Sequence, residues 1–60
     1  MPYINIRVAG ELSADQKAEI VKQVTQTMLD VANKPKEATY ITIDEVSRSN
    51  WAKGGELLQP

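Results

Sequence analysis

The chain has 60 residues, a net charge of −1, no cysteine and no histidine. A chain of this length predicts one domain, 1–60, and a core below roughly 70–80 residues rarely supplies more than ~3–5 kcal/mol. The missing residue types exclude disulfides, thiolate metal sites and the usual general base, and we expect no cofactor. Association with further subunits is therefore the leading expectation for how the fold is stabilised.

Charge and hydropathy exclude several kinds of partner. Acidic and basic residues are interspersed along the chain, without the basic stripe that is typical of nucleic-acid-binding proteins. No window holds 18 consecutive apolar residues, and the N-terminus has no signal-peptide pattern. We therefore expect a cytoplasmic protein that acts on a small molecule, with neither nucleic acid nor membrane as its partner.

Residues 2–8 alternate between apolar and polar side chains, with Ile4, Ile6 and Val8 on one face. This period of two, with β-branched residues, predicts a strand with one apolar face. Pro2 stands at its start, where a missing N–H costs no hydrogen bond of the sheet. The glycine in "AGEL" predicts a turn after the strand.

The stretch "SADQ" predicts the start of a helix. Ser13 and Gln16 have the spacing of a capping box, in which each side chain satisfies a free backbone N–H of the first turn. Apolar residues then fall on one half of a helical wheel as far as Asn33, and Pro35 ends the helix. Lys17 is the one charge inside the apolar arc. It is either a stem whose ammonium reaches solvent or a cation at the rim of a pocket.

Residues 39–46, "TYITIDEV", alternate again and predict a second strand. Strand, helix and strand predict a β-α-β subunit of the α/β (α+β) class with parallel strands. The neighbours Asp44 and Glu45 should point to opposite faces, which makes them a poor acid/base pair. Gly54 and Gly55 predict a hairpin. Because two strands make no stable sheet, we expect other subunits to extend it.

The residues offer one candidate for chemistry at the start of the chain. Removal of Met1 would leave Pro2 with a free secondary amine. An α-amine has a pKa of about 8, and an apolar pocket lowers the pKa toward the value near 7 that suits a general base. A secondary amine is also a nucleophile toward carbonyls. Trp51 could supply the apolar wall of such a pocket.

The order and spacing of "MP", "LSADQKAEIVKQVT", "ITIDEV" and "NWAKGGE" resemble the 4-oxalocrotonate tautomerase family of the tautomerase superfamily. The resemblance implies a β-α-β subunit with a C-terminal hairpin, in dimers with a four-stranded sheet that assemble as homohexamers (trimers of dimers). It also implies a catalytic amino-terminal proline, at Pro2, that moves a proton between carbon and oxygen of a conjugated enol or keto acid. Trp51 falls on the family's aromatic wall.

The sequence departs from the family at two substrate-binding arginines. Leu12, or Glu11 in a shifted alignment, stands at the first position and Tyr40 at the second. A dicarboxylate substrate is therefore not expected. Tyr40 could donate a hydrogen bond to a carbonyl, and Leu12 could help to keep the site dry. A single carboxylate could be held by one of four cations, although a surface ion pair is the competing interpretation for the two arginines: Arg7, Lys17, Arg48 or Lys53.

Three functions follow from these features. The first is a tautomerase or isomerase with Pro2 as the base. The second is a hydratase or dehalogenase of the same superfamily, in which a protonated Pro2 donates a proton while a carboxylate activates water. The third is a non-catalytic assembly that kept the fold and lost the chemistry.

Overall fold

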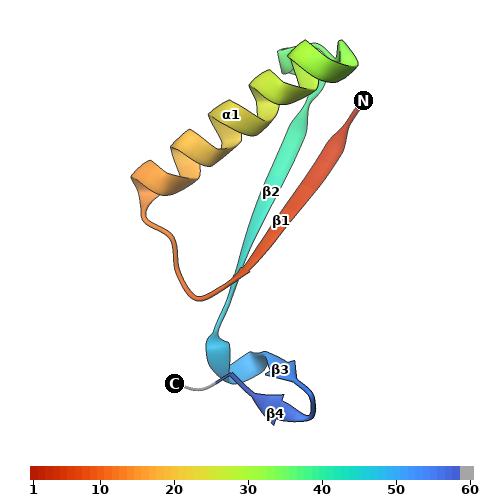
Figure 1. Cartoon of the computed structure of the whole chain (residues 1–60). Helices are drawn as coiled ribbons and strands as arrows, with labels where there is room; N and C mark the ends of the chain where they lie inside the picture. Colours follow the sequence, from red (N-terminus) through yellow and green to blue (C-terminus); the bar gives the residue numbers. More distant parts are fainter. Residues whose placement is uncertain (59–60) are drawn as a thin grey trace.

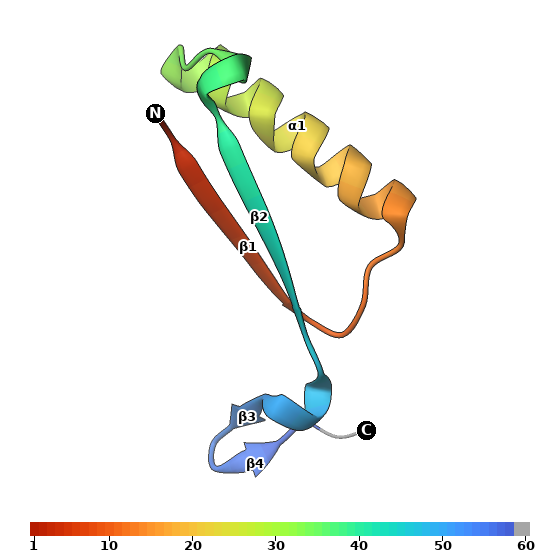
Figure 2. The ribbon, with the colours of Figure 1, turned by 180° about the vertical axis from the view of Figure 1, so that it is seen from behind.

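The computed structural model describes residues 1–58, so the last two residues of the predicted 1–60 domain lie outside it. Two strands run parallel, and the long helix lies along one face of the pair (Figure 1; Figure 2). The predicted β-α-β subunit with a C-terminal hairpin is confirmed. The elements in chain order are β1 (Tyr3–Ala9), α1 (Ala14–Ala32), η1 (Lys36–Ala38), β2 (Tyr40–Val46), η2 (Arg48–Asn50), β3 (Ala52–Lys53) and β4 (Glu56–Leu57).

α1 begins at the predicted capping box and ends, as predicted, by Asn33. The Ser13 hydroxyl accepts a hydrogen bond from the Gln16 N–H at 3.1 Å, and the Gln16 side chain accepts one from the Ser13 N–H at 2.8 Å. At the other end, Asn33 adopts φ 55°, a left-handed conformation, and its N–H bonds the Leu29 carbonyl. Asparagine tolerates this conformation better than most residues. No helix within residues 1–58 is long and apolar enough to cross a membrane.

The parallel register of β1 and β2 runs from Tyr3 opposite Tyr40 to Ala9 opposite Val46. One further hydrogen bond lies beyond each end of the pair: Tyr40 N–H to the Pro2 carbonyl at 3.0 Å, and Gly10 N–H to the Val46 carbonyl at 2.7 Å. Each strand starts one residue later than predicted, and β1 ends one residue later. Pro2 thus contributes its carbonyl to the sheet and needs no N–H there.

The C-terminal residues form the predicted hairpin, in which β3 and β4 pair antiparallel. Gly54 and Gly55 both have positive φ, 61° and 85°. Two-residue turns of this kind suit the twist of a hairpin and favour glycine at both positions. The hairpin lies apart from the helix, beyond the end of β2 (Figure 1).

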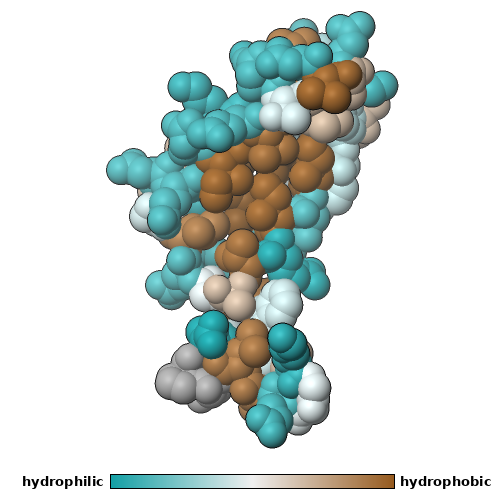
Figure 3. Space-filling model, viewed as in Figure 1, coloured by the Kyte–Doolittle hydropathy of each residue, from teal (hydrophilic) through white to brown (hydrophobic). Residues whose placement is uncertain are grey.

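The apolar layer between α1 and the strands is only half-buried. None of the residues 1–58 reaches the buried class, and apolar side chains gather in view between the helix and the sheet (Figure 3). The chain exposes 4651 Å², whereas a compact protein of 6.7 kDa exposes about 3,900 Å². Its radius of gyration is 14.4 Å, against about 10 Å for a compact 60-residue domain. One chain therefore does not cover its own apolar face.

The sheet face away from α1 carries a ladder of polar contacts. The Arg7 guanidinium lies 3.2 Å from the Asp44 carboxylate, and the Asn5 amide donates to Asp44 at 3.0 Å and to Thr42 at 2.7 Å. The Tyr3 and Thr42 hydroxyls are 2.8 Å apart. The hydrogen bond from Asn5, followed by that from Arg7, holds the pKa of Asp44 below its ordinary value of 3.8. The ion-pair interpretation of Arg7 is confirmed.

Substitution of Ser13 tests the helix cap. Ser13→Ala removes the acceptor for the Gln16 N–H and should lower the free energy of unfolding by about 1 kcal/mol. Urea unfolding at one fixed protein concentration measures the change. Ser13→Thr keeps the hydroxyl and is the matched control. Equal stability of the alanine variant and the wild type would show that the capping box contributes nothing.

Acid titration tests the polar ladder. Because the pKa of Asp44 is lower in the folded chain than in the unfolded chain, its ionised form stabilises the fold above the ordinary value of 3.8. That contribution should be lost as the pH falls through the lowered value. Asp44→Asn should therefore lose less stability than the wild type between about pH 5 and about pH 2, measured by urea midpoints. Identical pH slopes would contradict the assignment.

Candidate active site

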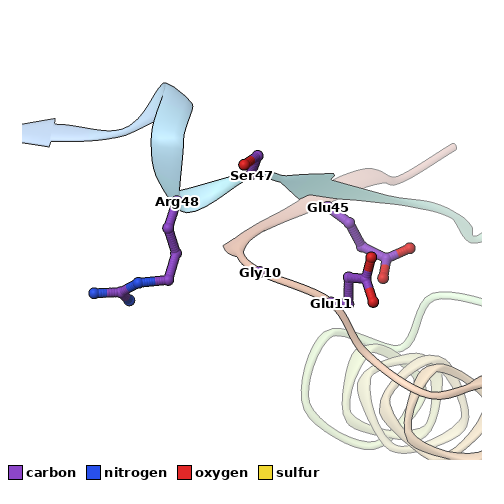
Figure 4. Close-up of a pocket in the computed structure, with 5 residues that line it drawn as sticks. All are labelled: Gly10, Glu11, Glu45, Ser47 and Arg48. Carbon is purple, nitrogen blue, oxygen red and sulfur yellow. The ribbon is translucent and has the colours of Figure 1, made fainter. Parts of the chain in front are cut away.

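A cleft of about 470 Å³ lies where β1 and β2 end. It is lined by Gly10, Glu11, Glu45, Ser47 and Arg48 (Figure 4). Gly10 adopts φ 99°, which lets the chain leave β1 sharply toward the helix. On the other side, the Ser47 hydroxyl accepts from the Ser49 N–H and begins the short helix η2. The two chain exits from the sheet thus form the walls of the cleft.

Arg48 is the cation of this cleft. Its guanidinium donates to the Leu58 carbonyl at 2.6 Å and points away from the two glutamates in Figure 4. This hydrogen bond ties η2 to the residue that follows β4. Glu11 also lines the cleft, on the loop between β1 and α1. The cleft therefore carries both signs of charge.

Glu45 holds the start of α1 against β2. Its carboxylate accepts from the Leu12 N–H at 2.8 Å and pairs with the Lys17 ammonium at 2.5 Å. The hydrogen bond from Lys17, followed by that from Leu12, lowers the pKa of Glu45 from its ordinary value of 4.5. Both interpretations of Lys17 from the sequence left its ammonium without a partner, whereas the structure pairs it with Glu45. Alternation separates Glu45 from Asp44, but it does not predict the pair with Lys17.

Asp44 and Glu45 point to opposite faces, as alternation predicts. Asp44 contacts Asn5 and Arg7 on the open face, whereas Glu45 contacts Lys17 and the Leu12 backbone on the helix side. The two carboxylates therefore do not form an acid/base pair. Residues 1–58 contain no group of three or more acidic side chains placed to hold a metal ion.

Pro2 lies at the opposite end of the strands from the cleft. β1 and β2 have seven residues each, a length of about 23 Å at about 3.3 Å per residue. The structure brings Pro2 next to Tyr40, whose N–H bonds the Pro2 carbonyl. Leu12 and Arg48 lie beyond the far ends of the strands. Within one chain, the predicted site residues therefore form two groups.

Trp51 belongs to the group far from Pro2. It is half-buried between η2 and β3, and its backbone bonds the Arg48 carbonyl and the Leu58 N–H. Its indole N–H is buried without a hydrogen-bond partner among residues 1–58. Buried polar groups without a hydrogen-bond partner are uncommon in folded proteins. The backbone hydrogen bonds thus place Trp51 next to η2 and Leu58.

Comparisons with known proteins agree on one family. The sequence profile of the Tautomerase family, described as "Tautomerase enzyme", matches residues 2–59. The chain is 40% identical over 57 residues to the probable tautomerase K2 of Dickeya dadantii. The alignment covers 93% of this chain and 85% of that protein.

Solved structures give the same result. The crystal structure of DmpI from Helicobacter pylori superposes with a TM-score of 0.87 at 35% identity, over 95% of this chain and 90% of that one. A 4-oxalocrotonate tautomerase isozyme from Methylibium petroleiphilum matches with a TM-score of 0.86 at 30% identity, over 95% and 92%. Together with the β-α-β fold and the hairpin, these matches place the chain in the 4-oxalocrotonate tautomerase family of the tautomerase superfamily.

Proposed function

We propose that Pro2, exposed as an amino-terminal secondary amine when Met1 is removed, is the general base of a keto–enol tautomerase. The amine takes the proton from the enol oxygen, the electrons of the O–H bond form the new C=O bond, and the electrons of the C=C bond take the proton back from the resulting ammonium at carbon. One proton leaves oxygen and one arrives at carbon, so the reaction is an isomerisation and needs no cofactor. The substrate class is a conjugated enol or 2-keto acid.

The match to the family, which starts at the proline, carries this proposal. The family match starts at residue 2, and the chain offers no histidine as a competing base. Pro2 is half-buried at the start of the sheet, beside Tyr40. In this role the Tyr40 hydroxyl donates a hydrogen bond to the substrate carbonyl and stabilises the developing enolate. The remaining site residues need a second subunit.

We extend the proposal to a composite site. If Pro2 and Trp51 act on one substrate, they come from different chains, because about 23 Å of strand separates their ends of the sheet. The half-covered apolar layer and the exposed Leu57, 58% accessible, support association. A homohexamer, a trimer of dimers with four-stranded sheets, would supply Trp51 and Leu12 as apolar walls and Arg48 as the receptor for one carboxylate.

A second function has one observation in its favour. Glu11 lines the cleft, and no hydrogen bond or ion pair engages its carboxylate within residues 1–58. Since Glu11 follows the end of β1 and Pro2 precedes its start, the carboxylate would come from another chain, where it could activate water while a protonated Pro2 donates a proton, as in a hydratase or dehalogenase. The pH dependence separates the two: the hydratase needs protonated Pro2 and loses activity as the amine deprotonates, whereas the tautomerase gains activity.

A free Pro2 amine without turnover of any enol would favour the non-catalytic alternative.

The first test changes the proline. Intact mass should show that Met1 is absent from the natively produced protein. A variant with a bulky residue inserted before Pro2 converts its nitrogen into an amide and should reduce turnover of phenylenolpyruvate by about 10²–10⁴-fold. Pro2→Ala should also be slower, and Pro35→Ala is the control. Unchanged turnover in the variants altered at Pro2 would refute the proposed base.

The second test mixes subunits. Pro2→Ala and Trp51→Ala should each impair turnover. Unfolding the two variants together in urea and refolding them should restore part of the activity, because some sites then combine an intact Pro2 with an intact Trp51. Each variant refolded alone is the control, and native mass spectrometry verifies that mixed assemblies form. No gain from verified mixtures would contradict a composite site.

A further inference from the structure

The loop between β1 and α1 is anchored at three of its four residues. The Gly10 N–H bonds the Val46 carbonyl at 2.7 Å, the Leu12 N–H bonds the Glu45 carboxylate at 2.8 Å, and the Ser13 N–H bonds the Gln16 side chain at 2.8 Å. The outer two anchors continue the sheet and begin the helix. The central anchor differs, because a side chain of β2 reaches across to the loop backbone. It ties the backbone of Leu12, next to Glu11, to β2.

Both oxygens of that carboxylate are used. Oε2 of Glu45 accepts from the Leu12 N–H, and Oε1 pairs with the Lys17 ammonium from the first turns of α1. The carboxylate side chain is 27% exposed and that of Lys17 is 39% exposed, so water screens the pair only in part. Hydrogen bonds to an ionised acceptor are stronger than those between neutral groups. Lys17 therefore fixes the orientation of the group that holds the loop.

We propose that Glu45 is a positioning residue for the active site: together with Lys17 it holds the 10–13 loop so that Leu12 and Glu11 stand at fixed places beside the cleft. The kinetic part of this inference rests on the proposed function, in which Leu12 forms a wall around the substrate. Glu45 contacts no reacting atom in this role. Its effect reaches the substrate through the backbone of Leu12.

The same contacts assign a role to Lys17. Its charge is matched by Glu45 at 2.5 Å, so it serves as the counter-ion of the loop anchor and not as the receptor for the substrate carboxylate. The two roles predict opposite effects of removing Glu45. If Lys17 were the receptor, Glu45→Ala would release the ammonium and lower KM for an anionic enol. As a positioning residue, Glu45 should raise KM when it is removed.

The experiment compares Glu45→Ala and Glu45→Gln with the wild type in the assembled protein. Amide hydrogen exchange reports the anchor directly: in Glu45→Ala the Leu12 N–H should exchange about tenfold faster relative to the Ile6 N–H of β1. Ile6 is the internal reference, because global loosening would accelerate both amides. Glu45→Gln keeps an oxygen that can accept from Leu12 and should recover much of the protection. Glu19→Ala, on the helix surface, is the matched control.

Kinetics with phenylenolpyruvate provide the second readout. Glu45→Ala should raise KM about tenfold and leave kcat within about twofold, because the wall is displaced while Pro2 is untouched. Glu45→Gln should lie between the alanine variant and the wild type.

Two outcomes overturn the inference. One is unchanged Leu12 exchange in Glu45→Ala. The other is a KM that stays constant or falls. If the wild type itself turns over no enol, the proposed function fails, and the Leu12 to Ile6 exchange ratio still decides whether Glu45 anchors the loop.

Discussion

In the parallel pair of β1 and β2, Tyr3 lies opposite Tyr40 and Ala9 lies opposite Val46, so both strands start at one edge and end at the other. Every candidate group takes its position from this arrangement. The starts of the strands hold Pro2, and their ends lead into the loop, the cleft and the hairpin. Since a parallel connection needs a crossover, the long helix between the strands follows from the same pairing.

Alternation along β2 divides its charges between two environments. Asp44 joins a polar ladder with Asn5 and Arg7 on the open face, and Glu45 joins Lys17 and the Leu12 N–H under the helix. Two acidic residues at neighbouring positions therefore have different roles. On one face it links the two strands to each other, and on the other it links the sheet to the start of α1.

The chain is also too small to bury its apolar layer. A single helix over two strands leaves the apolar layer half-buried, and the hairpin extends beyond the end of the sheet (Figure 1; Figure 3). The fold gains its elements from local signals such as the capping box and the glycine turn. The radius of gyration exceeds that of a compact domain, so the chain is too extended to cover this apolar layer with its own residues.

The sequence by itself determined the elements and their faces, because capping, alternation and turn residues act over a few positions. Ser13 and Gln16 located the helix start, the alternation over residues 39–46 located β2, and Gly54 and Gly55 located the hairpin, all within one residue. Only the tertiary structure decided which distant groups meet. It separated Pro2 from Arg48 and Trp51 within the chain, and it joined Lys17 to Glu45. Contacts between residues far apart in sequence depend on strand direction and register, which no local pattern encodes.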